Sequence, residues 1–162
     1  KALEKVKNKI FNKNNLLEKL EIWRDANKKI VFTNGCFDLI HLGHIEVLAR
    51  SADLGDILII GVNTDSSIKK LKGNNRPIIE ENSRAQQLAS LEFVDAVVLF
   101  NEQTPLELIK VIKPNIITKG GDYNFEQVVG NEIAVKNEGK VIIIPLTQGY
   151  STTSILNKIK ND

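Results

Sequence analysis

The stretch KIVFTNGCFDLIHLGHIEVLARSADLGDILIIGVN, residues 29–63, decides the fold class. It opens with a short apolar run and a polar turn, continues with apolar residues at helical spacing, and ends in an almost entirely apolar run. A short apolar run that ends at a turn is typical of a buried strand, and an all-apolar strand suits a sheet covered on both faces. The stretch therefore predicts a strand, a helix and a second strand.

The same alternation continues to the end of the sequence. Further strands are predicted at 95–100, 114–123 and 140–146, and further helices at 64–71, 82–91, 104–112, 131–139 and 151–160. Alternating strands and helices predict a parallel sheet with helices on both faces. We therefore predict an α/β fold, a Rossmann-like doubly wound sheet of five parallel strands in a domain of residues 28–162. Helical spacing of apolar residues predicts an N-terminal helical extension over residues 1–27.

Composition limits the class of protein. The 162 residues fit one domain, and 42% apolar with 26% charged residues is ordinary for a soluble globular chain. A net charge of +2 gives no support for a nucleic-acid-coating surface. The single cysteine, Cys36, excludes an internal disulfide and favours a reducing compartment. Without a long apolar run or the apolar core of a signal peptide, we expect a cytoplasmic protein with no nucleic-acid or membrane partner.

Polar clusters follow four of the predicted strands. They are TNGCFDLIHLGH (33–44), NTD (63–65), KGGDY (119–123) and TQGYSTT (147–153). In a doubly wound sheet, ligands bind at the carboxyl ends of the strands, near the point where the strand order reverses. The sequence therefore predicts one binding site built from these clusters.

The first cluster contains both histidines of the chain, His41 and His44. Three residues apart at the first turn of a helix, they are predicted to share one face, and the helix N-terminus favours an anion there. Gly35 and Gly43 permit a ligand to approach the backbone closely. The pair predicts a phosphate site, although one capping and one packing histidine is an alternative, and a zinc pair lacks further ligands. Asp38 either orients a ring or caps the turn.

Neither a P-loop nor a dinucleotide-binding fingerprint is present. GCFDLIHLGH followed by a helix resembles the GxFDxxHxGH signature of the HxGH nucleotidyltransferase (cytidylyltransferase-like) superfamily, whose members move a nucleoside monophosphate from a triphosphate. STTSIL (151–156) is similar to the second, SxT-type phosphate motif of that superfamily. LKGNNRPI (71–78), KGGDY and GYSTTSIL resemble the adenylyltransferase domain of the bacterial heptose-phosphate pathway, over roughly residues 29 to 160.

The resemblance implies that D-glycero-β-D-manno-heptose 1-phosphate attacks the α-phosphorus of ATP, giving ADP-heptose and pyrophosphate for lipopolysaccharide core synthesis. Both nucleophile and leaving group are already anionic, so the protein mainly positions phosphates and neutralises charge. Mg²⁺ is expected on the phosphates, with protein ligands that the sequence leaves unknown. The family is usually homodimeric. In many bacteria the domain is fused to a sugar kinase; here we expect it to stand alone, with a separate heptose kinase as a candidate functional partner.

The resemblance also assigns residues. The implied catalytic residues are His41, His44 and Lys72. The implied ATP-binding residues are Thr33, Asn34, Gly35, Phe37, His41, His44, Lys119, Gly120, Asp122, Tyr123, Ser151, Thr152 and Thr153. The implied sugar-phosphate residues are Asn63, Asp65, Arg76 and Arg84.

Structural alternatives stand beside several of these assignments. Lys72 could be part of a solvated helix end, Asp65 a helix cap, and Arg76 and Arg84 partners in surface salt bridges. Gly120–Gly121 could form a plain turn, and residues 151–153 could simply cap the last helix. Cys36 is expected to be a small packing residue, because no base is arranged to activate a thiol.

One departure from the superfamily bears on the nucleotide. Several cytidylyltransferases begin an RTxGxST segment with arginine, whereas this chain reads LTQGYST with Leu146 in that place. The pyrophosphate end then depends on Ser151, Thr152, Thr153 and Lys72. The alternatives to the adenylyltransferase are a cytidylyltransferase acting on glycerol 3-phosphate or a similar phospho-alcohol, and a nucleotide-binding domain without turnover.

Overall fold

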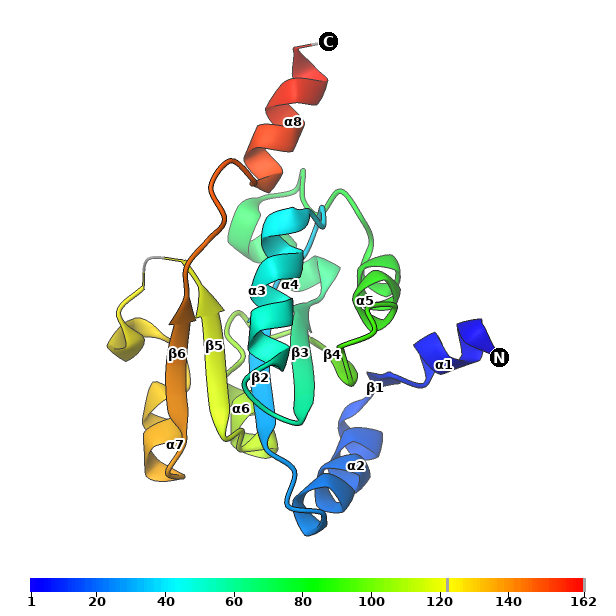
Figure 1. Cartoon of the computed structure of the whole chain (residues 1–162). Helices are drawn as coiled ribbons and strands as arrows, with labels where there is room; N and C mark the ends of the chain where they lie inside the picture. The colour runs from blue at the N-terminus through cyan, green and yellow to red at the C-terminus, as the bar shows by residue number, and fades with distance from the viewer. Residues whose placement is uncertain (122, 162) are drawn as a thin grey trace.

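The computed structural model describes residues 1–121 and 123–161 (Figure 1). The strands are β1 Ile10–Phe11, β2 Ile30–Gly35, β3 Ile57–Asn63, β4 Ala96–Phe100, β5 Ile116–Gly120 and β6 Lys140–Ile144. The α-helices are α1 Ala2–Lys7, α2 Lys13–Asp25, α3 Leu42–Ala52, α4 Asp65–Lys72, α5 Glu81–Ala89, α6 Leu106–Ile112, α7 Asn131–Lys136 and α8 Thr152–Lys160. A short 3₁₀ helix, η1, spans Phe125–Gln127.

All six strands form one parallel sheet, in the order β1-β4-β3-β2-β5-β6. From β2 the chain moves outward through β3 and β4, then returns to the other side of β2 for β5 and β6. The strand order therefore reverses between β2 and β5, and their carboxyl ends flank the crevice where such sheets bind ligands. This arrangement confirms the predicted α/β class and the five predicted strands.

A sixth strand, β1, lies inside the segment that was predicted to be helical. Ile10 and Phe11 pair with Val97 and Val98 of β4 and extend the sheet at that edge. A strand of two residues has too few positions to show an alternating apolar pattern, so periodicity could not identify it. The extension is therefore two helices with a short strand between them.

The two faces of the sheet have separate cores. Val31 and Phe32 are adjacent in β2 and completely buried, but they belong to different clusters, because neighbouring side chains of a strand point to opposite faces. The Phe32 cluster includes Leu20 of α2, and the Val31 cluster includes Leu48 of α3. Burying each such side chain stabilises the fold by about 1.5–3 kcal/mol. Helix α2 thus shares a core with the sheet, while the domain boundary at residue 28 stays a prediction.

Helix α8 differs from the other long helices. It projects beyond the carboxyl ends of the strands, and none of its described residues is buried (Figure 1). Within residues 1–121 and 123–161, no helix has the length and apolar character needed to cross a membrane.

Candidate active site

Two adjoining cavities lie at the carboxyl ends of the strands. The first has a volume of about 330 Å³ and lies between the ends of β2 and β5 and the starts of α3 and α8. The second, of about 440 Å³, extends toward the ends of β3, β4 and α4. The residues that line both are Asn34, Gly35, Cys36, Phe37, His44, Lys119, Tyr123 and Thr152. The four polar clusters therefore meet at one edge of the sheet.

Most of the residues singled out in the sequence line these cavities. Those in the first are Thr33, Asn34, Gly35, Phe37, His41, His44, Lys119, Gly120, Tyr123, Ser151 and Thr152. Lys72 and Asn63 line the second. Thr153, Asp65, Arg76 and Arg84 line neither. Asp122 lies outside the described residues.

His41 and His44 are stacked at the start of α3. Their ring centroids are 3.9 Å apart and their planes differ by 28°. His41 is the N-cap residue, and its backbone N–H donates to Nδ1 of His44 at 3.3 Å. Capping therefore uses Nδ1 of His44 as the acceptor. Among the described residues, the buried Nδ1 of His41 has no hydrogen-bond partner, which gives the pair further capacity for a polar ligand.

The environment disfavours the charged form of both rings. Burial lowers the pKa of His44 to about 4; the charges of His41 and Lys72 act in the same direction, and a hydrogen bond with the Leu39 carbonyl opposes them. Burial also lowers the pKa of His41. Both rings are therefore neutral at pH 7. A phosphate group beside them would raise their pKa values, because an anion favours the imidazolium form.

Gly35 and Gly43 make room for side chains of the protein itself. A Cβ at Gly43 would lie 3.0 Å from ring atoms of His41 and 3.4 Å from Cβ of Tyr150. A Cβ at Gly35 would lie 3.1 Å from the ring of Phe37. Both glycines also line the first cavity, so close approach of a ligand to their backbone stays a prediction. In addition, they let the rings of His41 and Phe37 pack closely against the backbone.

Two lysines lie at or near the shared wall, which consists of the residues that line both cavities. Lys119, at the end of β5, lines both cavities, and its Nζ lies 5.8 Å from the ring centroid of Tyr123. Burial lowers the pKa of Lys119, and the Cys36 thiol opposes this shift. Lys72, the last residue of α4, is exposed but lines the second cavity and influences the pKa of His44. One lysine therefore belongs to both cavities and the other only to the second.

Asp38 fixes the loop after α4 to the turn that carries the histidines. Its carboxylate is 5% exposed, accepts from the backbone N–H groups of Ile78 at 2.9 Å and Ile79 at 2.8 Å, and pairs with Nη1 of Arg76 at 3.3 Å. In the hydrogen bonds of the described residues, Asp38 contacts neither histidine, so it does not orient their rings. Arg76 is therefore held beside the second cavity, which Asp38 lines.

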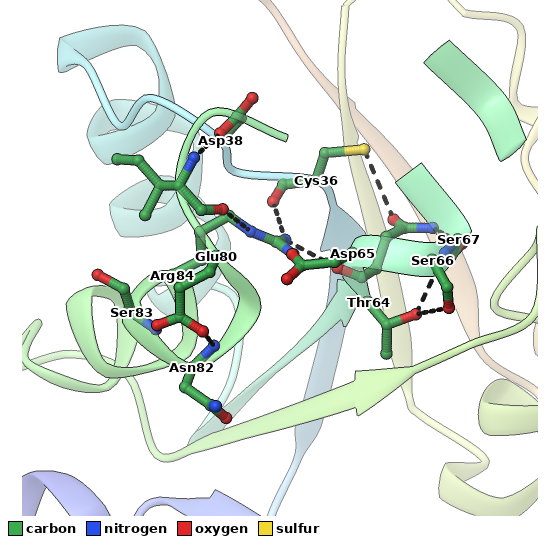
Figure 2. A network of polar contacts seen from close by, with 12 residues as sticks. Cys36, Asp38, Thr64, Asp65, Ser66, Ser67, Glu80, Asn82, Ser83 and Arg84 are labelled. Carbon is green, nitrogen blue, oxygen red and sulfur yellow. Dashed lines mark hydrogen bonds and ion pairs between the residues drawn. The ribbon is translucent and has the colours of Figure 1, made fainter. Parts of the chain in front are cut away.

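Arg84 is completely buried, which corrects the expectation that it meets a sugar phosphate directly. Its guanidinium donates to three backbone carbonyls and to Oδ1 of Asp65 at 2.8 Å (Figure 2). Asp65 does not cap α4; the N-cap is Thr64, whose Oγ1 accepts from the backbone of Ser67. Asn63, which lines the second cavity, donates through Nδ2 to Oγ of Ser67.

The start of α8 forms the remaining side of the first cavity. Ser151 is its N-cap, and its Oγ accepts from the backbone N–H of Ser154 at 3.0 Å. Ser151 and Thr152 line the cavity, whereas Thr153 is exposed outside it. Helix capping and phosphate binding are compatible here, because the helix N-terminus itself presents N–H groups.

Several lining residues were not among the implied catalytic, ATP-binding or sugar-phosphate residues, although some of them belong to the polar clusters. They are Cys36, Gly43, Val47, Leu146, Thr147 and Tyr150 in the first cavity, and Asp38, Leu71, Gln103, Thr104, Pro105 and Val129 in the second. Gln103, Thr104 and Pro105 follow β4, so the rule that ligands bind at strand carboxyl ends could have found them. Val47 and Leu71 are apolar helix residues, so nothing in the sequence distinguishes them from core residues.

The described residues offer little for a metal ion. They contain no group of three or more His, Cys, Asp or Glu side chains arranged to hold one. Asp38 is the one carboxylate among the described lining residues, and its oxygens already accept from the loop after α4. The chain's described residues therefore do not form a resident metal site at this edge.

Comparison with known proteins identifies a family and several relatives. The family described as Cytidylyltransferase-like matches residues 32–158. The Bifunctional protein HldE of Bradyrhizobium sp. (strain ORS 278) is 43% identical over 153 residues, which are 94% of this chain and 31% of that protein. The HldE of a Nitratiruptor species is 53% identical over 134 residues, 83% of this chain and 28% of that protein. The chain thus spans about a third of the length of these curated relatives.

A solved structure has a similar fold. The lipopolysaccharide core biosynthesis protein from Thermoplasma volcanium GSS1 is 34% identical, with a TM-score of 0.61. The match covers 76% of this chain and 99% of that one.

Proposed function

The chain belongs to the cytidylyltransferase-like family, and we propose that it is an adenylyltransferase that moves AMP from ATP to D-glycero-β-D-manno-heptose 1-phosphate. The products are ADP-heptose, for lipopolysaccharide core synthesis, and pyrophosphate. Similarity to the HldE proteins and to the Thermoplasma lipopolysaccharide core biosynthesis protein supports this choice of substrate.

The observation that carries the proposal is the pair of cavities with one shared wall. ATP occupies the first cavity, with its triphosphate toward the starts of α3 and α8, where helix termini and hydroxyl groups favour an anion. The sugar phosphate occupies the second. The attacking oxygen then meets the α-phosphorus at the wall formed by residues such as His44, Lys119 and Thr152.

Catalysis in this proposal is positional and electrostatic. The nucleophile is a phosphate oxygen that is already anionic, so no general base is needed. Charge that develops on the pentavalent phosphorus is met by His44 and Lys119, and Lys72 approaches from the end of α4. Leu146 lines the nucleotide cavity without a cation, so Ser151 and Thr152 take the pyrophosphate end.

Mg²⁺ enters as an ion carried by ATP, whose phosphate oxygens are its ligands in this proposal. Asp38, the described carboxylate at this edge, is already bonded to backbone N–H groups. We therefore assign no step of the reaction to a metal ion held by the protein.

The proposal extends to partners and location. A homodimer is supported by the apolar surface around α8, where Ile159 is 64% exposed and Ile155 lies beside Leu39, Ile40 and Leu91. A heptose kinase activity supplies the sugar phosphate, and the reaction runs in the cytoplasm, where ATP is made. Sedimentation equilibrium tests the dimer.

A matrix of two nucleotides and two phospho-acceptors tests the reaction itself. Pyrophosphate release is measured with ATP or CTP, each with heptose 1-phosphate or glycerol 3-phosphate. We expect turnover with ATP and heptose 1-phosphate. Preference for CTP and glycerol 3-phosphate would make the protein a cytidylyltransferase instead. ATP binding without product across both acceptors would contradict an enzymatic role.

A further inference from the structure

Arg84 connects three loops from inside the protein. Its Nη1 donates to the carbonyls of Cys36 and Asn63, both at 2.7 Å, and its Nε donates to the carbonyl of Ile79 at 2.9 Å. Its Nη2 pairs with Asp65 at 2.8 Å. Figure 2 shows the guanidinium between the turn after β2 and the start of α4. One side chain thus joins the β2–α3, β3–α4 and α4–α5 connections.

A contribution to stability alone does not explain why a buried arginine occupies position 84. Burying a guanidinium carries a large desolvation cost, and apolar replacements of buried ion pairs are often neutral or stabilising. The helix that carries Arg84 does not need it for capping, because the Glu80 carboxylate already accepts from the backbone of Asn82 and Ser83. An apolar side chain could not reproduce the hydrogen bonds by which Arg84 fixes three backbone carbonyls.

One of those carbonyls controls a strained turn. The Cys36 carbonyl belongs to the peptide that precedes Phe37, and Phe37 has a φ of +49°. Left-handed backbone is rare for a bulky residue and persists only where neighbouring contacts impose it. Here Arg84 holds the residue before Phe37, and the carboxylate of Asp38, the residue after it, is anchored by backbone N–H groups of the loop after α4.

Phe37 in turn contacts the candidate catalytic pair. Its ring is 8% exposed and lies 5.4 Å from the ring of His44, centroid to centroid. The His44 ring therefore contacts two rings, those of Phe37 and His41. Any rotation of the turn at Phe37 removes one of the two surfaces that hold His44.

We infer that Arg84 is a positioning residue: by fixing the Cys36–Phe37 peptide it holds the Phe37 ring against His44 at the wall between the cavities. It touches neither cavity itself. The inference rests on the proposed function only for its effect on turnover; its effect on the His44 ring does not depend on the substrate.

The test uses Arg84→Lys and Arg84→Gln in the full chain. The protein has only two histidines, so two imidazole Hε1 signals report on the pair by proton NMR. In both variants we expect the His44 signal to move and its pKa to rise toward 6.5 as the ring loses its packing. We expect kcat with ATP and heptose 1-phosphate to fall about 10- to 100-fold, the loss typical of small misplacements, while KM for ATP changes much less.

The matched control is Asp95→Ala. The Asp95 carboxylate accepts from the backbone of Leu58 at 2.8 Å, at the opposite, amino-terminal edge of the sheet. This variant loses a partly buried hydrogen bond without touching the site. It should be destabilised yet keep both kcat and the His44 signal, which separates positioning from general loss of stability.

A folded Arg84→Lys variant with wild-type kcat and an unmoved His44 signal would overturn the inference. If neither Arg84 variant folds, Phe37→Ala decides, because it leaves Arg84 intact and removes only the ring; an unmoved His44 signal there overturns the route through Phe37. If the wild-type protein forms no product from ATP and heptose 1-phosphate, the proposed function fails, and the NMR result still decides the role of Arg84.

Discussion

At the scale of single residues, His44 carries a titratable ring that folding keeps neutral. Its pKa is about 4 in the folded protein, against 6.5 as its ordinary value. As the pH falls, the unfolded chain binds a proton at this ring before the folded protein does, so the free energy of unfolding decreases. We expect this contribution to be fully present above about pH 6.5 and lost as the pH falls toward 4.

Thermal unfolding between about pH 7.5 and about pH 4, which spans the titration of an ordinary histidine, measures this contribution by comparing the wild-type protein with His44→Asn. The variant should lose less stability on acidification. Burial raises the pKa of Asp95, which acts in the opposite direction at low pH, but it is common to both proteins and cancels in the difference. Parallel stability curves would contradict the assigned pKa.

Gly43 offers a second test at this scale. In Gly43→Ala the new Cβ meets ring atoms of His41 at 3.0 Å, so the ring must shift. Alanine loses less backbone entropy than glycine on folding, and this gain offsets the cost of moving the ring, so the melting temperature should change little. Turnover should fall about 10-fold or more, because a displaced ring no longer meets the phosphates. A variant that is both less stable and fully active would refute this account of the glycine.

At the scale of elements, α8 is a weakly packed helix whose N-terminal end lines the site. Its N-cap lines the first cavity although the described part of the helix has no buried residue. Ser151→Ala removes the hydroxyl that accepts from Ser154, a loss of about 1 kcal/mol for the helix. Because the helix is packed so little, the global melting temperature should change only slightly, while KM for ATP rises.

The control on the same helix is Asn157→Ala, since Asn157 is exposed and away from both cavities. It should leave KM for ATP unchanged. Equal KM values for the Ser151 and Asn157 variants would show that the start of α8 does not hold the nucleotide.

At the scale of the whole molecule, α2 belongs to the core of the sheet. Leu20 is completely buried in the same cluster as Ile30 and Phe32, whereas Leu17 on the same helix is 45% exposed. Leu20→Ala should lower the free energy of unfolding by about 2–5 kcal/mol, and Leu17→Ala should change it little. Urea unfolding measures both. Equal, small effects would mean that residues 1–27 form a unit separate from the sheet.

Local features of the sequence predict a large part of this protein. Short apolar runs alternate with segments whose apolar residues have helical spacing. The parallel sheet and its five main strands therefore follow from residues that are neighbours in the chain. Since parallel strands place their carboxyl ends at one edge, the meeting of the clusters around His44, Lys119 and Ser151 follows as well. The polar residues then indicate phosphate binding. Histidine, lysine and hydroxyl side chains can bind phosphate oxygens together with the N–H groups of a helix N-terminus.

Only the tertiary structure decides what the individual side chains do. An arginine is usually exposed, but the fold encloses Arg84, and its guanidinium donates four hydrogen bonds, three to carbonyls and one to Asp65. Gly43 accommodates the ring of His41, and α2 joins the core, through contacts that sequence spacing does not encode. Hydrogen bonding, desolvation and packing depend on which distant residues the fold brings within a few ångströms. Secondary structure and the edge that carries the site are therefore determined locally, whereas the role of each residue at that edge is determined by its three-dimensional neighbours.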